Sequence, residues 1–289
     1  MSALEEAFKS GKFVVTAEVG PPKGVNIETM LEDAETLRGK VEAINVTDQQ
    51  SSVMRLGSLA VSHLLRERGL EPVYQVTCRD RNRIALQSDL LSAYALGIEN
   101  VLCLTGDYVT LGDHPQAKPV FDLDSVSLLQ AVATLQAGKD LAGKDLNGVP
   151  RFFPGAVVTP GAQPLEPQLI KMEKKIKAGA RFFQTQAVYD PTLFERFMEA
   201  ARPFGVPVML GVVLLKSAGM ARFMNRNVAG VHVPDSLIEE IERAPSKPQK
   251  SVEIAARLIS EMRGLCQGVH IMAIGWERRI PQVLDAAGL

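Results

Sequence analysis

Short apolar runs rich in β-branched residues alternate along the chain with longer segments in which apolar residues recur every three or four positions. The runs predict eight strands, over 13–19, 41–48, 72–78, 100–107, 152–160, 181–188, 207–215 and 268–276. The segments between and after them predict helices near 27–39, 53–69, 81–97, 124–137, 165–179, 191–203, 236–264 and 278–287.

This alternation of strands and helices indicates parallel strands joined by right-handed crossovers. Eight such units predict an α/β fold, a (β/α)8 TIM barrel that spans residues 1–289 as one domain. An open, doubly wound sheet is the alternative. Against it, no GxGxxG motif follows any predicted strand, and Gly20-Pro21-Pro22 is a poor phosphate-binding turn.

Composition excludes several classes of partner. The 32 Lys and Arg balance 33 Asp and Glu, with no basic stripe, so a nucleic-acid partner is not expected. The three cysteines lie far apart, with no Cys/His cluster that would indicate a metal site. No apolar run approaches the roughly 18 residues that span a bilayer, and the N-terminus does not resemble a signal peptide. We therefore expect a cytoplasmic protein with reduced thiols.

Polar residues gather at the predicted carboxyl ends of the strands, where barrel enzymes place their active sites. They are Glu18, Thr47, Asp48, Gln75, Thr77, Asp107, Thr159, Gln184, Gln186, Lys216 and Trp276. Each threonine has an ordinary explanation in β propensity, and Asp48 and Asp107 in capping or turn formation. Gln184 and Gln186 share one side of their strand, so two amides there need partners and favour a ligand.

Glu18 is the most informative of these residues, because it lies within an apolar run, "VVTAEV" (14–19), that should be covered on both faces. Alternation places Glu18 on the same face as Val14 and Thr16. Burial favours the protonated form of a carboxyl group, which suits a general acid. The alternative is a structural ion pair with a lysine or arginine.

Three motifs in this order resemble the methylenetetrahydrofolate reductase family, and the likeness covers residues 13–289. They are "AEVGPP" (17–22), "TGD" (105–107) and "KKIKAGARFFQTQAVYD" (174–190). The resemblance implies a flavin-containing barrel that passes a hydride from NADH or NADPH to the flavin, and then to 5,10-methylenetetrahydrofolate. The product is 5-methyltetrahydrofolate.

The resemblance also implies roles for residues. Glu18 would be the general acid, Asp107 would act in catalysis beside the flavin and the pterin, and Gln186 would bind the pterin. The flavin contacts would come from Thr47, Gln75, Thr105, Gly106, Asp107, Thr159, Gln163 and Lys175, the last near the phosphate side.

The chain departs from the family pattern at several positions. Val19-Gly20 replaces an aromatic pair, Thr105 an arginine and Thr159 a tyrosine, which leaves FMN as an alternative to FAD. The overall pattern is most similar to the branch of anaerobic one-carbon pathways, which implies a small zinc or iron-sulfur partner subunit and a homo- or hetero-oligomer. Two other functions stay open: a flavin-free, methyltransferase-like barrel that binds a pterin, and a barrel that serves as a scaffold for an electron-transfer partner.

Overall fold

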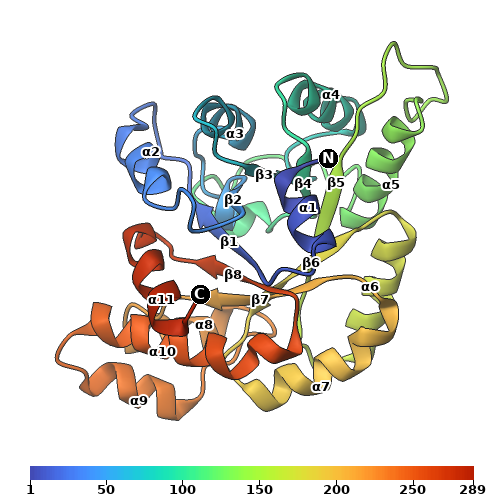
Figure 1. The fold of residues 1–289 in the computed structure, drawn as a ribbon. Coiled ribbons are helices and arrows are strands. Elements are labelled where there is room, and N and C mark those ends of the chain that lie inside the picture. The colour runs from blue at the N-terminus through green and yellow to red at the C-terminus, as the bar shows by residue number, and fades with distance from the viewer.

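Eight parallel strands close into a barrel in the order β1 to β8, with β8 paired to β1, in the computed structural model of residues 1–289. Figure 1 shows the helices arranged around this barrel. The predicted (β/α)8 architecture is therefore confirmed. The strands are β1 (Val14–Val19), β2 (Ala43–Val46), β3 (Pro72–Thr77), β4 (Asn100–Leu104), β5 (Phe153–Val158), β6 (Phe182–Ala187), β7 (Val208–Val213) and β8 (Gly268–Met272).

Eleven α-helices and five short 3-10 helices accompany the strands. The α-helices are α1 (Ala3–Lys9), α2 (Glu28–Glu35), α3 (Ser58–Glu67), α4 (Arg83–Ala95), α5 (Ser125–Gln136), α6 (Glu166–Lys177), α7 (Pro191–Ala201), α8 (Ala218–Asn227), α9 (Asp235–Arg243), α10 (Lys247–Met262) and α11 (Ile280–Ala287). The 3-10 helices are η1 (Gln50–Ser52), η2 (Val109–Leu111), η3 (Arg202–Phe204), η4 (Arg263–Leu265) and η5 (Glu277–Arg279).

The sequence prediction was wrong about the segment between β7 and β8. The helix expected over 236–264 is two helices, α9 and α10, because the chain turns at Ala244 and Ser246 begins α10 by accepting a hydrogen bond from the Gln249 N–H. Helix α8 was not predicted at all. Ser217 begins it in the same way, with its side chain accepting from the Met220 N–H.

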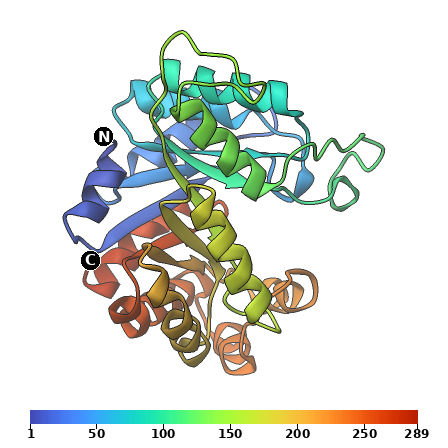
Figure 2. The same ribbon diagram turned by 90° about the vertical axis from the view of Figure 1, so that its right-hand side faces the viewer.

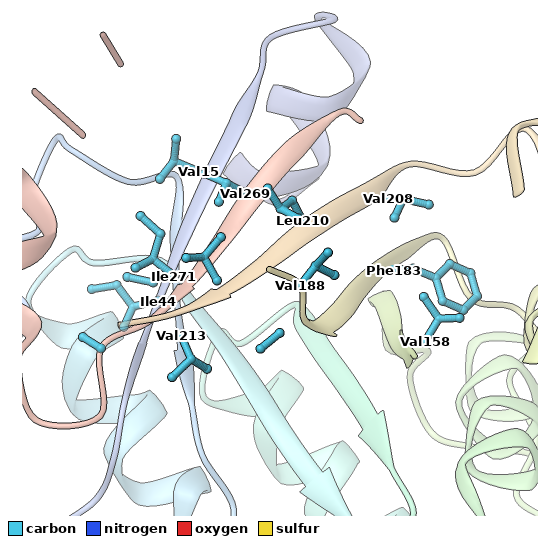
Figure 3. Close-up of a cluster of buried hydrophobic side chains, with 14 of the residues drawn as sticks. Val15, Ile44, Val158, Phe183, Val188, Val208, Leu210, Val213, Val269 and Ile271 are labelled. Carbon is cyan, nitrogen blue, oxygen red and sulfur yellow. The ribbon is translucent and has the colours of Figure 1, made fainter. Parts of the chain in front are cut away.

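The strands bury both of their faces. Their outward side chains, some of which are shown in Figure 3, pack against the surrounding helices in the main core. The inward side chains at the amino-terminal end form a second apolar cluster that contains Val14, Phe153 and Phe182, and Leu4 of α1 packs onto it. The Phe153 and Phe182 rings stack with centroids 5.1 Å apart. Helix α1 thus closes one end of the barrel.

The opposite end stays open for a site. Figure 2 views the barrel from the side, with α1 at the left and the β4–α5 segment projecting at the right. Most strands end two or more residues before the sequence prediction, so residues such as Thr47, Asp107 and Thr159 lie in the loops that follow the strands. No helix of the chain is long and apolar enough to cross a membrane.

Candidate active site in the barrel mouth

A layer of polar side chains lies inside the barrel between the apolar cluster and the open end. The Asn45 and Gln184 amides bond each other in both directions, at 2.8 and 3.1 Å. Gln184 Nε2 also donates to Thr16 Oγ1 (3.2 Å), which lies 2.9 Å from His270 Nδ1. All of these side chains are buried. Each of them bonds another member of the layer, which avoids the cost of burying a polar group without a partner.

Glu18 lies directly above this layer, with 8% of its surface exposed. Gln75 Nε2 donates to Glu18 Oε2 at 3.1 Å, and His270 Nε2 is 3.7 Å from the same oxygen. If the Thr16 hydroxyl, which already accepts from Gln184, donates to His270 Nδ1, the ring hydrogen remains on Nε2 and faces Glu18. No lysine or arginine lies within 4 Å of the carboxylate, so the alternative of a structural ion pair does not hold.

Two cavities meet at Glu18. The first, which we call the mouth cavity, measures about 290 Å³ and is lined by Gln75, Thr105, Gly106, Asp107 and Gln186 among others. The second, the outer cavity, measures about 380 Å³ and lies between the ends of β1 and β8 and helix α2. Glu18 and Gln50 line both. The carboxylate can therefore face a ligand that extends from one cavity into the other.

The structure brings six predicted site residues together around the mouth cavity, namely Glu18, Gln75, Thr105, Gly106, Asp107 and Gln186. Asp107 is exposed, and the Ser51 N–H donates to its Oδ2 at 3.1 Å. Thr105 Oγ1 accepts from the Ser125 N–H at the start of α5 (3.1 Å). Gly106 has φ +96°, and a Cβ there would lie 3.0 Å from that of Arg79, so the tight loop requires glycine.

Two of the predicted amides differ in role. Gln184 lines the mouth cavity, but its Nε2 donates to Asn45 and Thr16 and its Oε1 accepts from Asn45, so the expectation that both glutamines await a ligand is wrong for Gln184. Gln186 is half-buried at the mouth cavity. Thr185 Oγ1 donates to its backbone carbonyl (2.7 Å), and no side chain of the protein bonds its amide. Gln186 is therefore the amide available to a bound molecule.

Four predicted residues do not line the mouth cavity. Thr47 is buried, with its Oγ1 3.8 Å from the position of a Cβ on Gly20, and this Oγ1 has no hydrogen-bond partner in the chain. Thr159 is half-buried and faces Gly230, where an added Cβ would lie 2.3 Å from its Cγ2. Gln163 is exposed in the β5–α6 loop. Lys175 is buried, and its Nζ donates to the Val157 carbonyl (2.6 Å).

Sequence reasoning missed the residues that hold this site in place. His270 and Asn45 were detectable as polar residues on the inward faces of apolar strands. Arg79 carried no such signal. It is almost fully buried, pairs with Asp80 (2.8 Å) and donates to the carbonyls of Gln49 and Asp107, both at 3.4 Å. It thereby joins the loops that follow β2 and β4.

Asp48 has a structural role, but it does not cap the segment that follows it, as the predicted alternative expected. It accepts from the Thr77 N–H and Oγ1, both at 2.9 Å, and pairs with Arg81 at 2.7 Å. These contacts join the ends of β2 and β3 beside the cavity. No group of three or more His, Cys, Asp or Glu side chains in the chain could hold a metal ion.

The fold and the site define a (β/α)8 barrel with a buried carboxylate at a two-part cavity in its mouth. Residues 3–288 match the family model described as methylenetetrahydrofolate reductase, and the chain belongs to that family.

Curated relatives agree with this assignment. The chain is 24% identical to 5,10-methylenetetrahydrofolate reductase of Pectobacterium carotovorum, with 87% of this chain and 80% of that enzyme covered. It is 22% identical to a probable methylenetetrahydrofolate reductase (NADPH) of Caenorhabditis elegans, with 99% of this chain covered but only 44% of the nematode protein.

A solved Clostridium thermocellum protein has a similar fold, with a TM-score of 0.65, 15% identity and coverage of 98% and 97% of the two chains. It is described as an uncharacterized protein that binds two copies of 5-methyl-5,6,7,8-tetrahydrofolic acid.

The contrast between the two glutamines predicts different effects on stability. Gln184→Met should lower the free energy of unfolding by about 1–3 kcal/mol, because it leaves the buried Asn45 amide without its partner. Gln186→Met should change it by less than about 0.5 kcal/mol, because that amide has no partner to lose. Urea unfolding of both variants measures the difference, and equal losses would contradict the assignment of Gln184 to structure and Gln186 to the ligand.

The lowered pKa of the buried Lys175 should make the free energy of unfolding depend on pH. Burial, followed by repulsion from Lys171, lowers the pKa of Lys175 from 10.5 to about 8 in the folded protein. Between these two values the unfolded chain binds more protons than the folded chain, so stability should rise with pH there. Relative to Lys175→Met, the wild type should gain about 2–3 kcal/mol between pH 7 and pH 10.

Urea unfolding at a series of pH values tests this, and taking the difference between the two proteins cancels other titrating groups. The exposed Lys174, on the same helix, provides the control. Lys174→Met should follow the wild type at every pH. A constant difference between wild type and Lys175→Met would show that the buried ammonium does not titrate in this range.

Proposed function

We propose that this protein reduces 5,10-methylenetetrahydrofolate to 5-methyltetrahydrofolate by ping-pong hydride transfer, with a flavin as carrier and Glu18 as the general acid. The observation that carries the proposal is a buried carboxylate, with no lysine or arginine partner, at the junction of two cavities in a barrel of this family. FAD is the proposed flavin, with FMN as the alternative, and NADH or NADPH is the proposed donor.

The chemistry of the substrate explains why an acid is needed. The bridging methylene carbon accepts a hydride only after one of its C–N bonds breaks and an iminium forms. The electron pair of that bond goes to the aminobenzoyl nitrogen, which must then take up a proton. A protonated Glu18 would supply it, and a positioned acid of this kind typically contributes 10²–10⁴-fold to the rate. Gln75 and His270 would hold the carboxyl group toward the cavities.

Residues around the mouth cavity fit the polar edges of a pterin and of a flavin. A bound molecule would satisfy the amide of Gln186, which no side chain of the protein bonds. Thr47 lines neither cavity, and its unpartnered hydroxyl would reach a flavin only if the segment around Gly20 moved. Gln75 and the Thr105–Asp107 loop would contact the flavin, and Asp107 and Gln186 the pterin. When bound, a flavin supplies hydride transfer between the nicotinamide and the folate.

Three predicted cofactor contacts have less support. Lys175 lies behind β5 with its ammonium occupied by a backbone carbonyl, so we do not assign it to a phosphate. Thr159 and Gln163 would reach a flavin only if its dinucleotide half extended along the β5–α6 loop. An electron-delivering zinc or iron-sulfur subunit is the alternative to a nicotinamide donor.

A visible spectrum followed by anaerobic titration tests the proposal. The purified protein should show a flavin spectrum that bleaches with NADH or NADPH and recovers with 5,10-methylenetetrahydrofolate. A flavin that only the folate perturbs would indicate a partner subunit as donor. Absence of flavin after reconstitution with FAD or FMN, with folate binding retained, would contradict the flavin-dependent reaction and favour the flavin-free pterin-binding barrel.

Replacement of the proposed acid should separate two activities. Glu18→Gln should lower folate reduction by about 10²–10⁴-fold, because only that reaction consumes the proton. Oxidation of NADH by the quinone menadione should stay within a few-fold of wild type, because it bypasses the folate. Both are followed at 340 nm in initial-rate assays.

The exposed Glu195 of α7 provides a matched control, since Glu195→Gln makes the same chemical change far from the cavities. It should leave both activities unchanged. An equal loss of both activities in Glu18→Gln would assign Glu18 to structure or cofactor positioning. Unchanged folate turnover in Glu18→Gln would exclude Glu18 as the general acid, and only the loss of a partner complex in that variant would favour the scaffold function.

A further inference from the structure

Helix α4 has apolar side chains on both of its faces, although it lies at the outside of the barrel (Figure 1). On one face, Leu86, Leu90 and Ala93 are buried in the core. On the other face, Ile84 is 74% exposed and Leu91 is 36% exposed. A helix that is apolar all round is normally covered on every side. The outer face of α4 therefore has the composition of a contact surface.

An open groove of about 800 Å³ runs beside this outer face. Leu135 of α5, and Leu141 and Leu146 of the loop that follows α5, line the groove together with residues of α4. The Leu141 N–H donates to Gln87 Oε1 of α4 at 2.7 Å, which fixes the loop to the helix. The groove and the exposed stripe of α4 form one surface, which we call the α4 surface. The stripe consists of Ile84, Ser88, Leu91 and Ala95.

Every charged side chain on α4 or lining the groove is already engaged within the chain. Arg83 pairs with Asp122 and Asp89 pairs with Arg81, both at 2.9 Å. Asp140, in the groove, accepts two backbone N–H groups. Helix α5 has no charged residue, whereas α7 and α10 each expose several. Depletion of charge is typical of the centre of a protein interface.

The order of side chains along the stripe indicates which partner fits it. Ile84, Ser88, Leu91 and Ala95 are alternately large and small, at intervals of four, three and four residues. An antiparallel copy of the stripe has the same intervals, with each large side chain opposite a small one. Ile84 would face Ala95 of the partner subunit, and Leu91 would face Ser88 of the partner subunit. A two-fold axis produces this arrangement, because it places one surface against itself.

We propose that the α4 surface is the interface of a two-fold homodimer, in which the α4 helices of two copies of this chain pack antiparallel. A stable interface takes about 800 Å² from each partner, more than one helix stripe offers. The groove, and the exposed Tyr94 and Leu96 at the carboxyl end of α4, would therefore be covered as well. The inference is independent of the proposed reaction, because no residue of α4 lines the mouth cavity or the outer cavity.

Sedimentation velocity at protein concentrations of about 1–100 μM tests the interface. The wild type should sediment as a dimer. Ile84→Lys should raise the Kd of the dimer by about 30-fold or more, because it places a charge in the apolar centre of the contact. Ile170→Lys makes the same chemical change on α6, where Ile170 is 47% exposed, and should leave the Kd unchanged.

A second substitution tests the antiparallel pairing. Ala95→Glu alone should also weaken the dimer. Combined with Ile84→Lys it should restore the Kd to within about tenfold of wild type, because each introduced lysine faces a glutamate across the two-fold axis. Within one helix these positions are about 16 Å apart, so the two charges cannot pair there. Circular dichroism should show that all variants are folded, since the three substituted residues are exposed.

Three results would overturn the proposal. The first is a wild type that stays monomeric over the whole concentration range. The second is a dimer that Ile84→Lys does not weaken, or that Ile170→Lys weakens equally. The third is a dimer that is lost in both single variants and not regained in the double variant, which would contradict the antiparallel two-fold contact.

Discussion

The placement of one carboxylate inside a barrel depends on the polar layer beneath it. A charged or polar group in a barrel interior is costly unless its hydrogen bonds are complete. Asn45, Gln184, Thr16 and His270 meet this condition by bonding one another, so the layer can lie directly on the apolar cluster below. Glu18 then rests on His270 and Gln75 at the open end, with its carboxylate directed to the cavities.

The layer also divides the barrel into two parts with different functions. Below it, stacked phenylalanines and helix α1 fill the interior and close the barrel. Above it, two residues fix the loops after the strands to one another. Arg79 donates to the backbone carbonyls of Gln49 and Asp107. Asp48 accepts from the Thr77 N–H and forms an ion pair with Arg81. A site built on such joined loops needs little reorganisation when a ligand binds, which is the condition for efficient positioning of reacting groups.

Both cavities at Glu18 combine polar and charged side chains with a few apolar ones. The mouth cavity has Asp107 and Gln186 beside Leu102 and Leu104. The outer cavity has Asp33, Arg55 and Glu277 beside Met30 and Ile274. Glu18 therefore faces a mostly polar environment on both sides.

The sequence by itself determined the architecture, the positions of the eight strands and the inward direction of Glu18, because period-2 and period-3.6 patterns are local properties of the chain. It also placed Gln75, Asp107 and Gln186 at one rim, since parallel strands end at the same side. Only the tertiary structure decided which polar groups are already satisfied. Gln184 and Gln186 have the same type and parity, yet Asn45 from a distant strand occupies one and leaves the other free. Lys175 differs from expectation for the same reason, because the Val157 carbonyl on the neighbouring strand β5 occupies its ammonium.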